Sequence, residues 1–345
     1  MKAEDAKKLV VKAGIKLVQS GLIARTWGNV SCRIDSETFA ITPSGRDYMS
    51  LSPEDIVEVK ISDLSYSGSI KPSSEKGIHK EVYERFPHIN FVIHTHQENA
   101  SAISAAGIDE IPIRYEDYKK DSSFSEKILC SEYALPGTKA LRKNVATTLN
   151  KTKSNAIVLK HHGALCYGKD YESTFITAHQ LEDICLNYIN EKGGNLSVSN
   201  KKNENALPHQ LIDIKNSVIE KKGGYVLFCN DAEVLMCSKM NTPLLPYLDD
   251  FAQIVGLKSK VCNIDIQSIL KALNHSSAVL INNIGALCWG INKEDAEAVN
   301  MILRKNSKAY LTAKLFNNLR PINPIESALM RLVYLKKYSK LSEKK

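Results

Sequence analysis

Two stretches of the chain match each other, and this repeat limits the folds that the sequence can adopt. Residues 156–168 read Ala-Ile-Val-Leu-Lys-His-His-Gly-Ala-Leu-Cys-Tyr-Gly, and residues 278–290 read Ala-Val-Leu-Ile-Asn-Asn-Ile-Gly-Ala-Leu-Cys-Trp-Gly. In each, an apolar run typical of a buried strand is followed by a glycine turn and a second apolar run. A chain of 345 residues is long enough for two domains with separate cores. We therefore expect a duplicated fold rather than a short solenoid repeat.

A polar segment between the two copies predicts the domain boundary. Gly193-Gly194-Asn195 is followed by a polar run from Ser197 to Asn205, which is the composition of a linker. We expect a first domain over residues 1–195, a linker over 196–206 and a second domain over 207–340.

The short apolar run Phe91-Val92-Ile93 predicts a buried strand that continues into His94 and His96. Alternate side chains of a strand point to the same face, so both imidazoles can reach one metal ion. The pair alone is more often a set of surface or hydrogen-bonded histidines. A third histidine, at 161 or 162, would complete three nitrogen ligands with an open position, the pattern of a catalytic zinc site.

Two other groups of residues have anion-binding chemistry. A Gly28-Asn29 turn and a Ser44-Gly45 turn have backbone N–H groups and hydroxyls that could bind an anion. The same residues are also typical of two turns with no binding role. Ser73 and Ser74 directly precede Glu75 and a predicted helix, where they are either helix caps or an anion site at the helix N-terminus.

Composition and charge narrow the function classes. The net charge is +8, but no basic run interleaved with aromatic residues favours nucleic acid. No apolar run approaches the 18 residues of a membrane span, and the N-terminus has no signal-peptide core. The eight cysteines are scattered without a Cys-x-x-Cys pair, which favours a reducing cytoplasm. We expect no nucleic-acid or membrane partner. The positive charge indicates either a solvated surface and C-terminal tail or an anionic small-molecule substrate.

Five motifs occur in an order that resembles the class II aldolase/adducin family, over residues 20 to 190. The motifs are Gly28-Asn29-Val30-Ser31, Thr42-Pro43-Ser44-Gly45, Ser73-Ser74-Glu75, His94-Thr95-His96 and His162-Gly163-Ala164-Leu165. Five motifs in sequence are far more specific than any one of them.

The resemblance implies an α/β fold of three α/β/α layers, present twice, and a role for each matching residue. His94, His96 and His162 match the ligands of Zn²⁺ or another divalent metal, and Glu75 matches the catalytic acid/base. Tyr115 matches a tyrosine that in related aldolases serves a neighbouring subunit's site. The positions that match the family's phosphate-binding residues are Asn29, Ser44, Gly45, Ser73 and Ser74.

The function implied is that of a zinc-dependent lyase that cleaves a carbon–carbon bond of a phosphorylated ketose through an enediolate, with Glu75 moving the proton. The nearest type is fuculose-phosphate aldolase, and the resemblance also implies a homo-oligomer. Three alternatives share the scaffold: a sugar-phosphate 4-epimerase, a methylthioribulose-phosphate dehydratase and a non-catalytic, adducin-like binding protein. The epimerase typically has Asp where this chain has Glu75.

The second copy has lost the chemical groups. Ile284 stands where the first copy has His162, Asn283 stands at His161, and no His-X-His occurs after residue 207. Upstream, residues 260–262 are set against residues 128–130, cysteine against cysteine. We expect residues 207–340 to be a metal-free, aldolase-like domain that takes the place of a neighbouring subunit, so that a dimer imitates a tetramer.

Overall fold

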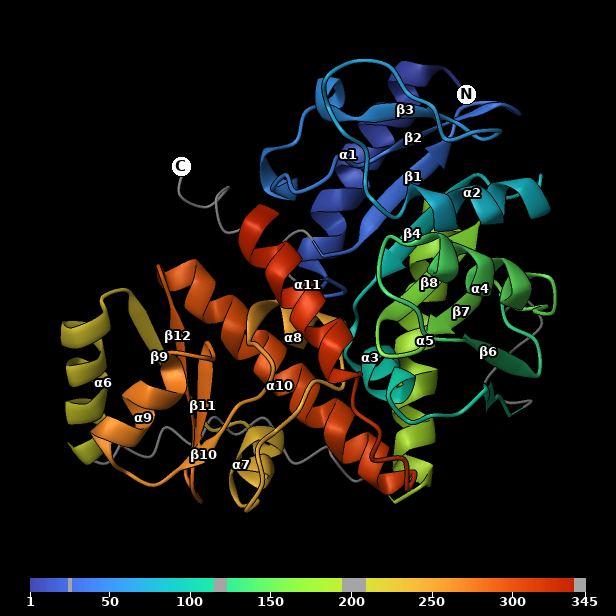
Figure 1. Cartoon of the computed structure of the whole chain (residues 1–345). Coiled ribbons are helices and arrows are strands. Elements are labelled where there is room, and N and C mark those ends of the chain that lie inside the picture. The colour runs from blue at the N-terminus through green and yellow to red at the C-terminus, as the bar shows by residue number, and fades with distance from the viewer. Residues whose placement is uncertain (24–26, 115–122, 194–208, 338–345) are drawn as a thin grey trace. The chain divides into compact units, whose positions relative to one another are not determined.

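The computed structural model of the protein describes residues 1–23, 27–114, 123–193 and 209–337 (Figure 1). The predicted linker 196–206 and Tyr115 lie outside these ranges. The chain divides into two compact units, Met1–Tyr188 and Ile189–Lys345, and each is described by itself. Within the described ranges, no helix has the length and apolar composition needed to cross a bilayer.

The first unit is built on a mixed sheet of eight strands. Their order is β3-β2-β1-β4-β8-β7-β6-β5, and β6 and β7 form the one parallel pair among them. The strands are β1 (Asn29–Arg33), β2 (Thr38–Ile41), β3 (Val57–Lys60), β4 (Phe91–Thr95), β5 (Glu110–Pro112), β6 (Lys127–Ser131), β7 (Ala156–Leu159) and β8 (Gly163–Gly168). The helices are α1 (Ala3–Gln19), α2 (Lys76–Arg85), α3 (Glu98–Ser104), α4 (Lys139–Leu149) and α5 (Tyr171–Glu191), with short 3-10 turns at Tyr48–Ser50 and Pro53–Asp55.

Helices cover both faces of this sheet. On one face, Val82 of α2 and Val145 of α4 share an apolar core with Val92 of β4. On the opposite face, the ring of Phe91 packs edge-on against Tyr171 of α5, with centroids 5.7 Å apart. Because neighbouring strand residues point to opposite faces, β4 contributes side chains to both layers, and all five of its residues are buried.

Two glycines let the neighbouring strands approach β4 closely. A Cβ atom at Gly163 would lie 2.2 Å from the Thr95 carbonyl oxygen, and one at Gly28 would lie 2.6 Å from that of His94. Gly28 also has a φ of 120°, in the region that favours glycine. Both close approaches lie where β4 ends, so they set the backbone positions around His94 and His96.

The second unit has a four-stranded sheet in the order β10-β11-β12-β9. Its hydrophobic core contains Val218 of α6 (His209–Lys222), Ile269 of α9 (Ile266–Leu273) and Val279 of β11 (Ala278–Ile281). The strands are β9 (Tyr225–Cys229), β10 (Val261–Cys262), β11 (Ala278–Ile281) and β12 (Gly285–Gly290). The helices are α6 (His209–Lys222), α7 (Ala232–Ser238), α8 (Asp249–Ile254), α9 (Ile266–Leu273), α10 (Lys293–Leu315) and α11 (Pro324–Lys337).

This sheet has the strand order and directions of β6-β7-β8-β4 in the first unit. In both units one parallel pair is followed by two antiparallel pairs. The hairpins have the same register, with Val158 opposite Ala164 in one and Leu280 opposite Ala286 in the other. Even the strained backbone position recurs, since His161 has a φ of 58° and Asn283 a φ of 61°.

The registers give second-unit counterparts for the three predicted metal-ligand positions. Leu287 of β12, the counterpart of Leu165, pairs with Phe228, whereas Leu165 pairs with His94. Counting two residues on, Asn230 corresponds to His96, and Ile284 corresponds to His162. None of these three side chains is a histidine.

The register also corrects the expected match of the two cysteines upstream. Cys262 pairs with Ile281, and the equivalent Leu159 pairs with Ser131. Cys262 therefore corresponds to Ser131, one residue later than the match with Cys130.

Candidate metal centre

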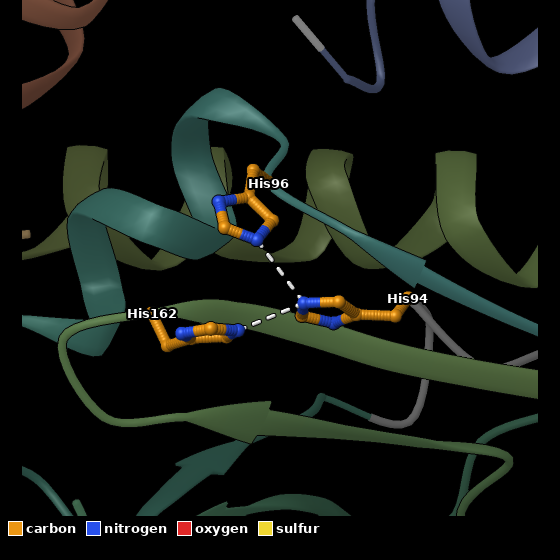
Figure 2. Close-up of side chains that lie close together, drawn as sticks. All are labelled: His94, His96 and His162. Carbon is orange, nitrogen blue, oxygen red and sulfur yellow. Dashed lines mark hydrogen bonds between the residues drawn. The ribbon is translucent and has the colours of Figure 1, made fainter. Parts of the chain in front are cut away.

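Three histidines from two neighbouring parts of the sheet converge in the first unit. His94 is on β4, His96 follows its last residue, and His162 precedes β8 in the turn from β7. All three are buried, with exposed fractions of 0%, 9% and 2%. Figure 2 shows the rings of His96 and His162 turning a nitrogen toward the same nitrogen of His94.

The distances between these nitrogens suit ligands of one ion. The Nε2 atom of His94 lies 2.8 Å from Nε2 of His162 and 3.1 Å from Nε2 of His96. One ligand nitrogen from each ring lies within 4.8 Å of the others. Tetrahedral zinc with Zn–N bonds of about 2.0–2.1 Å separates its nitrogens by roughly 3.3 Å, so the two distances from His94 are within a few tenths of an ångström of that spacing.

His94 is held in the protonation form that a metal ligand requires. Its Nδ1 atom lies 2.9 Å from the carbonyl oxygen of Ala164, which can only accept, so Nδ1 carries the proton. Burial lowers the pKa of His94 well below its usual range, against the opposing effect of Glu75. With its proton on Nδ1, the ring turns its Nε2 lone pair toward the other two histidines.

Glu75 lies directly beside the three histidines, as the residue that precedes α2. Its Oε1 is 3.2 Å from Nε2 of His162, and its Oε2 is 3.3 Å from Nε2 of His94. Burial acts to raise the pKa of this carboxyl, but His94, His162 and His96 outweigh it, so the pKa is lowered. The site thus places an ionised carboxylate against three nitrogens that could hold a metal ion.

Asn29 completes the contacts of Glu75. Its Nδ2 donates a hydrogen bond of 3.1 Å to Oε2 of Glu75, and its Oδ1 contacts Nε2 of His79. The other ring nitrogen of His79 lies 2.6 Å from the hydroxyl of Ser31, which lies 2.7 Å from that of Tyr83. Asn29, one of the predicted phosphate-binding residues, therefore has its amide occupied by Glu75 and His79.

The sequence reasoning missed Ser31, His79 and Tyr83 as parts of the site. One signal was present, because His79 and Tyr83 follow Glu75 at four-residue steps and so share one face of α2. Ser31 lies two residues after Asn29 on β1, on the same face of that strand.

The remaining predicted anion residues come together through backbone pairing. The Ser44 N–H donates to the carbonyl of Lys71, and the Ser73 N–H donates to that of Thr42. This pairing places the Ser44-Gly45 turn beside Ser73. The Ser73 side chain is buried. Ser74 lines a cavity of about 170 Å³ next to Glu75, together with Lys76, Thr138 and Arg142.

His161 has a different position from His162. Its ring packs edge-on against Tyr133, with centroids 5.4 Å apart, and its N–H donates to the carbonyl of Ser104. The buried group of three ligand nitrogens contains His162, the histidine that directly precedes the glycine.

The buried position of His79 makes a pH-dependent contribution to stability. Burial lowers its pKa to about 3, with Glu75 acting in the opposite direction. In the unfolded chain the pKa is about 6.5, so unfolding takes up a proton between these values, and stability falls as the pH decreases below about 6.5.

We predict that His79→Gln makes the stability of the metal-free protein less sensitive to acid. Because glutamine takes up no proton, the loss of unfolding free energy from pH 7 to 5 shrinks by up to about 1.4 kcal/mol per pH unit below 6.5. Urea unfolding at both pH values measures the difference, with the exposed His88→Gln as control. An unchanged pH dependence of His79→Gln would contradict the assignment.

Comparisons with known proteins identify the family of the chain. The family model of the Class II Aldolase and Adducin N-terminal domain matches residues 8–189, more than half of the chain. A solved structure of L-fuculose 1-phosphate aldolase is 27% identical, with a TM-score of 0.50, and the match covers 63% of this chain and 96% of that protein.

Two further solved structures are similar at lower identity. The L-fuculose-1-phosphate aldolase of Thermus thermophilus is 24% identical, with a TM-score of 0.46, over 58% of this chain and 100% of that protein. YgbL from Escherichia coli is 20% identical, with a TM-score of 0.48, over 53% of this chain and 88% of that protein. The family match covers all three histidines and Glu75, and the chain belongs to the class II aldolase and adducin family.

Proposed function

We propose that the protein is a class II aldolase, a zinc- or other divalent-metal-dependent lyase that cleaves a carbon–carbon bond of a phosphorylated ketose. The observation that carries this proposal is the buried carboxylate of Glu75, 3.2 to 3.3 Å from two of three convergent histidine nitrogens. The similarity to a fuculose-phosphate aldolase at 27% identity supports the same class of reaction.

His94, His96 and His162 would hold the metal ion. A divalent ion bound there supplies positive charge against the oxygen on which negative charge develops as the bond beside the carbonyl breaks. The His94 ring needs no reorientation to serve, because Ala164 already fixes its proton on the far nitrogen.

Glu75 would move the proton of the reaction. It is ionised, so it accepts a proton from the substrate in one direction and returns it in the other. The surrounding apolar core and the buried histidines exclude water, which strengthens the electrostatic interactions of the carboxylate with its neighbours.

The substrate's phosphate would bind at the paired turns around Ser44 and Ser73. Their backbone pairing, which uses the Ser44 N–H, places the Ser44-Gly45 turn beside Ser73, so the two serine hydroxyls and the Gly45 N–H are the groups proposed to bind the anion. Ser74 borders the cavity that Lys76 also lines, and the positive charge of Lys76 favours an anion there. Asn29 would hold Glu75 in place through its hydrogen bond in addition to binding the phosphate.

We also propose that the second unit is a duplicate of the first without its metal site. The shared strand order, the shared hairpin registers and the matching φ of His161 and Asn283 support a common origin. Phe228 and Ile284 occupy the counterparts of two ligand positions, so the first unit would bind the metal.

A homo-oligomer in the cytoplasm completes the proposal. Helix α11 exposes Ile325, Leu329 and Leu332, which share one helix face and suit association with another copy. The cysteines are unpaired in the structure, and those that are buried have raised pKa values, as suits a reducing compartment.

We predict that His94→Ala removes zinc binding while the exposed His88→Ala does not. Loss of a ligand should lower zinc affinity by more than about 100-fold, since disturbing a ligand's hydrogen-bond partner alone costs about 10- to 100-fold. Competition with a zinc-binding dye measures both variants after metal removal and reloading. Wild-type affinity in His94→Ala would contradict the proposed site.

We predict that Glu75→Gln abolishes most of the activity without releasing the metal. Removing the group that moves the proton should lower kcat by about 10²- to 10⁴-fold, with wild-type zinc content. The substrate comes from a screen of ketose phosphates for aldehyde release, and the exposed Glu37→Gln serves as control.

The screen also separates the alternatives. Release of an aldehyde supports the lyase. Epimerisation or dehydration without aldehyde release, or no reaction with any ketose phosphate by the zinc-loaded protein, would contradict it.

A further inference from the structure

A continuous chain of buried side chains lies behind Glu75. It runs from Glu75 to Asn29, His79, Ser31 and Tyr83, and each member contacts the next. All five are at least nine-tenths buried, and His79 and Ser31 have no exposed surface. Water therefore cannot easily replace any of these contacts.

The orientation of the Asn29 amide determines the direction of the first hydrogen bonds. Its Nδ2 group donates to Oε2 of Glu75 at 3.1 Å. The amide oxygen Oδ1 then faces His79, and the Nε2 atom of His79 must carry a proton and donate.

The rest of the chain follows from the neutral state of His79, which burial favours. With its proton on Nε2, the Nδ1 atom accepts, and the Ser31 hydroxyl donates to it. Ser31 has then used its only proton and accepts from the Tyr83 hydroxyl. Every hydrogen bond from Tyr83 to Glu75 thus points the same way.

Metal binding makes this orientation important, an argument that rests on the proposed function. The Nε2 atoms of His94 and His162 are the other groups close to the Glu75 carboxylate. When their lone pairs are directed at a metal, they offer no proton to Glu75. The Asn29 amide still donates its hydrogen bond to Oε2 of Glu75. If the amide were flipped, its oxygen would face the negative charge of the carboxylate.

We propose that His79 is a positioning residue whose Nε2–H form, set by Ser31 and Tyr83, fixes the Asn29 amide so that it donates to Glu75. His79 acts through Asn29 and touches neither the metal ligands nor the reacting atoms in this scheme. Its effect is to keep the carboxylate in one orientation during proton transfer.

The first test measures the proton position directly, without any substrate. Long-range ¹H–¹⁵N NMR spectra of the full-length protein with ¹⁵N-labelled histidine distinguish the two neutral forms of each ring, and His79→Gln identifies the His79 signals. We expect the Nε2–H form at neutral pH in both the metal-free and the zinc-loaded protein. The Nδ1–H form or a doubly protonated ring would overturn the proposal.

The second test compares two substitutions on the ketose phosphate that the screen identifies. His79→Leu removes the donor and should lower kcat by about 10- to 100-fold, as loss of a ligand's supporting partner does, while KM changes less than about threefold. His79→Gln places an amide N–H near the Nε2 position and should recover most of this loss. Equal kcat in wild type and His79→Leu, or equal losses in both variants, would overturn the proposal.

A matched control separates positioning from general damage to α2. Val82→Ala opens a cavity in the core beside the same helix, because Val82 is fully buried there and its side chain takes no part in the hydrogen bonds of the chain. It should lower the melting temperature and leave kcat unchanged. A fall in kcat equal to that of His79→Leu would show a merely structural effect and overturn the proposal.

The two tests distinguish failure of this inference from failure of the proposed function. If no ketose phosphate reacts, the proposed function fails, and the NMR spectra still decide the proton position of His79. If a substrate is cleaved and His79→Leu retains full kcat, the proposed function stands and the positioning role fails.

Discussion

The pairing of β4 with β8 is the constraint on which the rest of the site depends. His94 lies on β4 opposite Leu165, and Gly163 begins β8 so close to the Thr95 carbonyl that no Cβ fits between them. This approach brings His162, the residue before Gly163, to the end of β4 where His96 emerges. Strand pairing, rather than any local sequence preference, brings together histidines that are far apart in the chain.

Burial then determines the electrostatics of this site. A carboxylate inside a protein normally has a raised pKa, yet the histidines around Glu75 lower it. The same burial keeps His79 neutral, and the Ala164 carbonyl holds the proton of His94 on Nδ1, so the lone pairs of both rings have defined directions. A directed ring nitrogen, an ionised carboxylate and an oriented amide thus occur together in one buried location.

The sequence predicted those parts of the site that depend on short-range periodicity. His94 and His96 share a face because alternate strand residues do, and the repeated hairpin was visible as repeated residues. The partners of His79 could not be predicted, because Asn29 and Ser31 are about fifty positions away and meet it only through the packing of α2 on β1. The match of Cys262 was one residue early, since a two-residue strand carries no periodicity to set its register.

The central claim is that His94, His96 and His162 bind one metal ion, and X-ray absorption at the zinc edge tests it most directly. For the zinc-loaded protein we predict three imidazole nitrogens at about 2.0–2.1 Å and one or two oxygens, with no sulfur. The His94→Ala variant should lose this signal. A first shell that contains sulfur, or one with no imidazole nitrogen, would contradict the account.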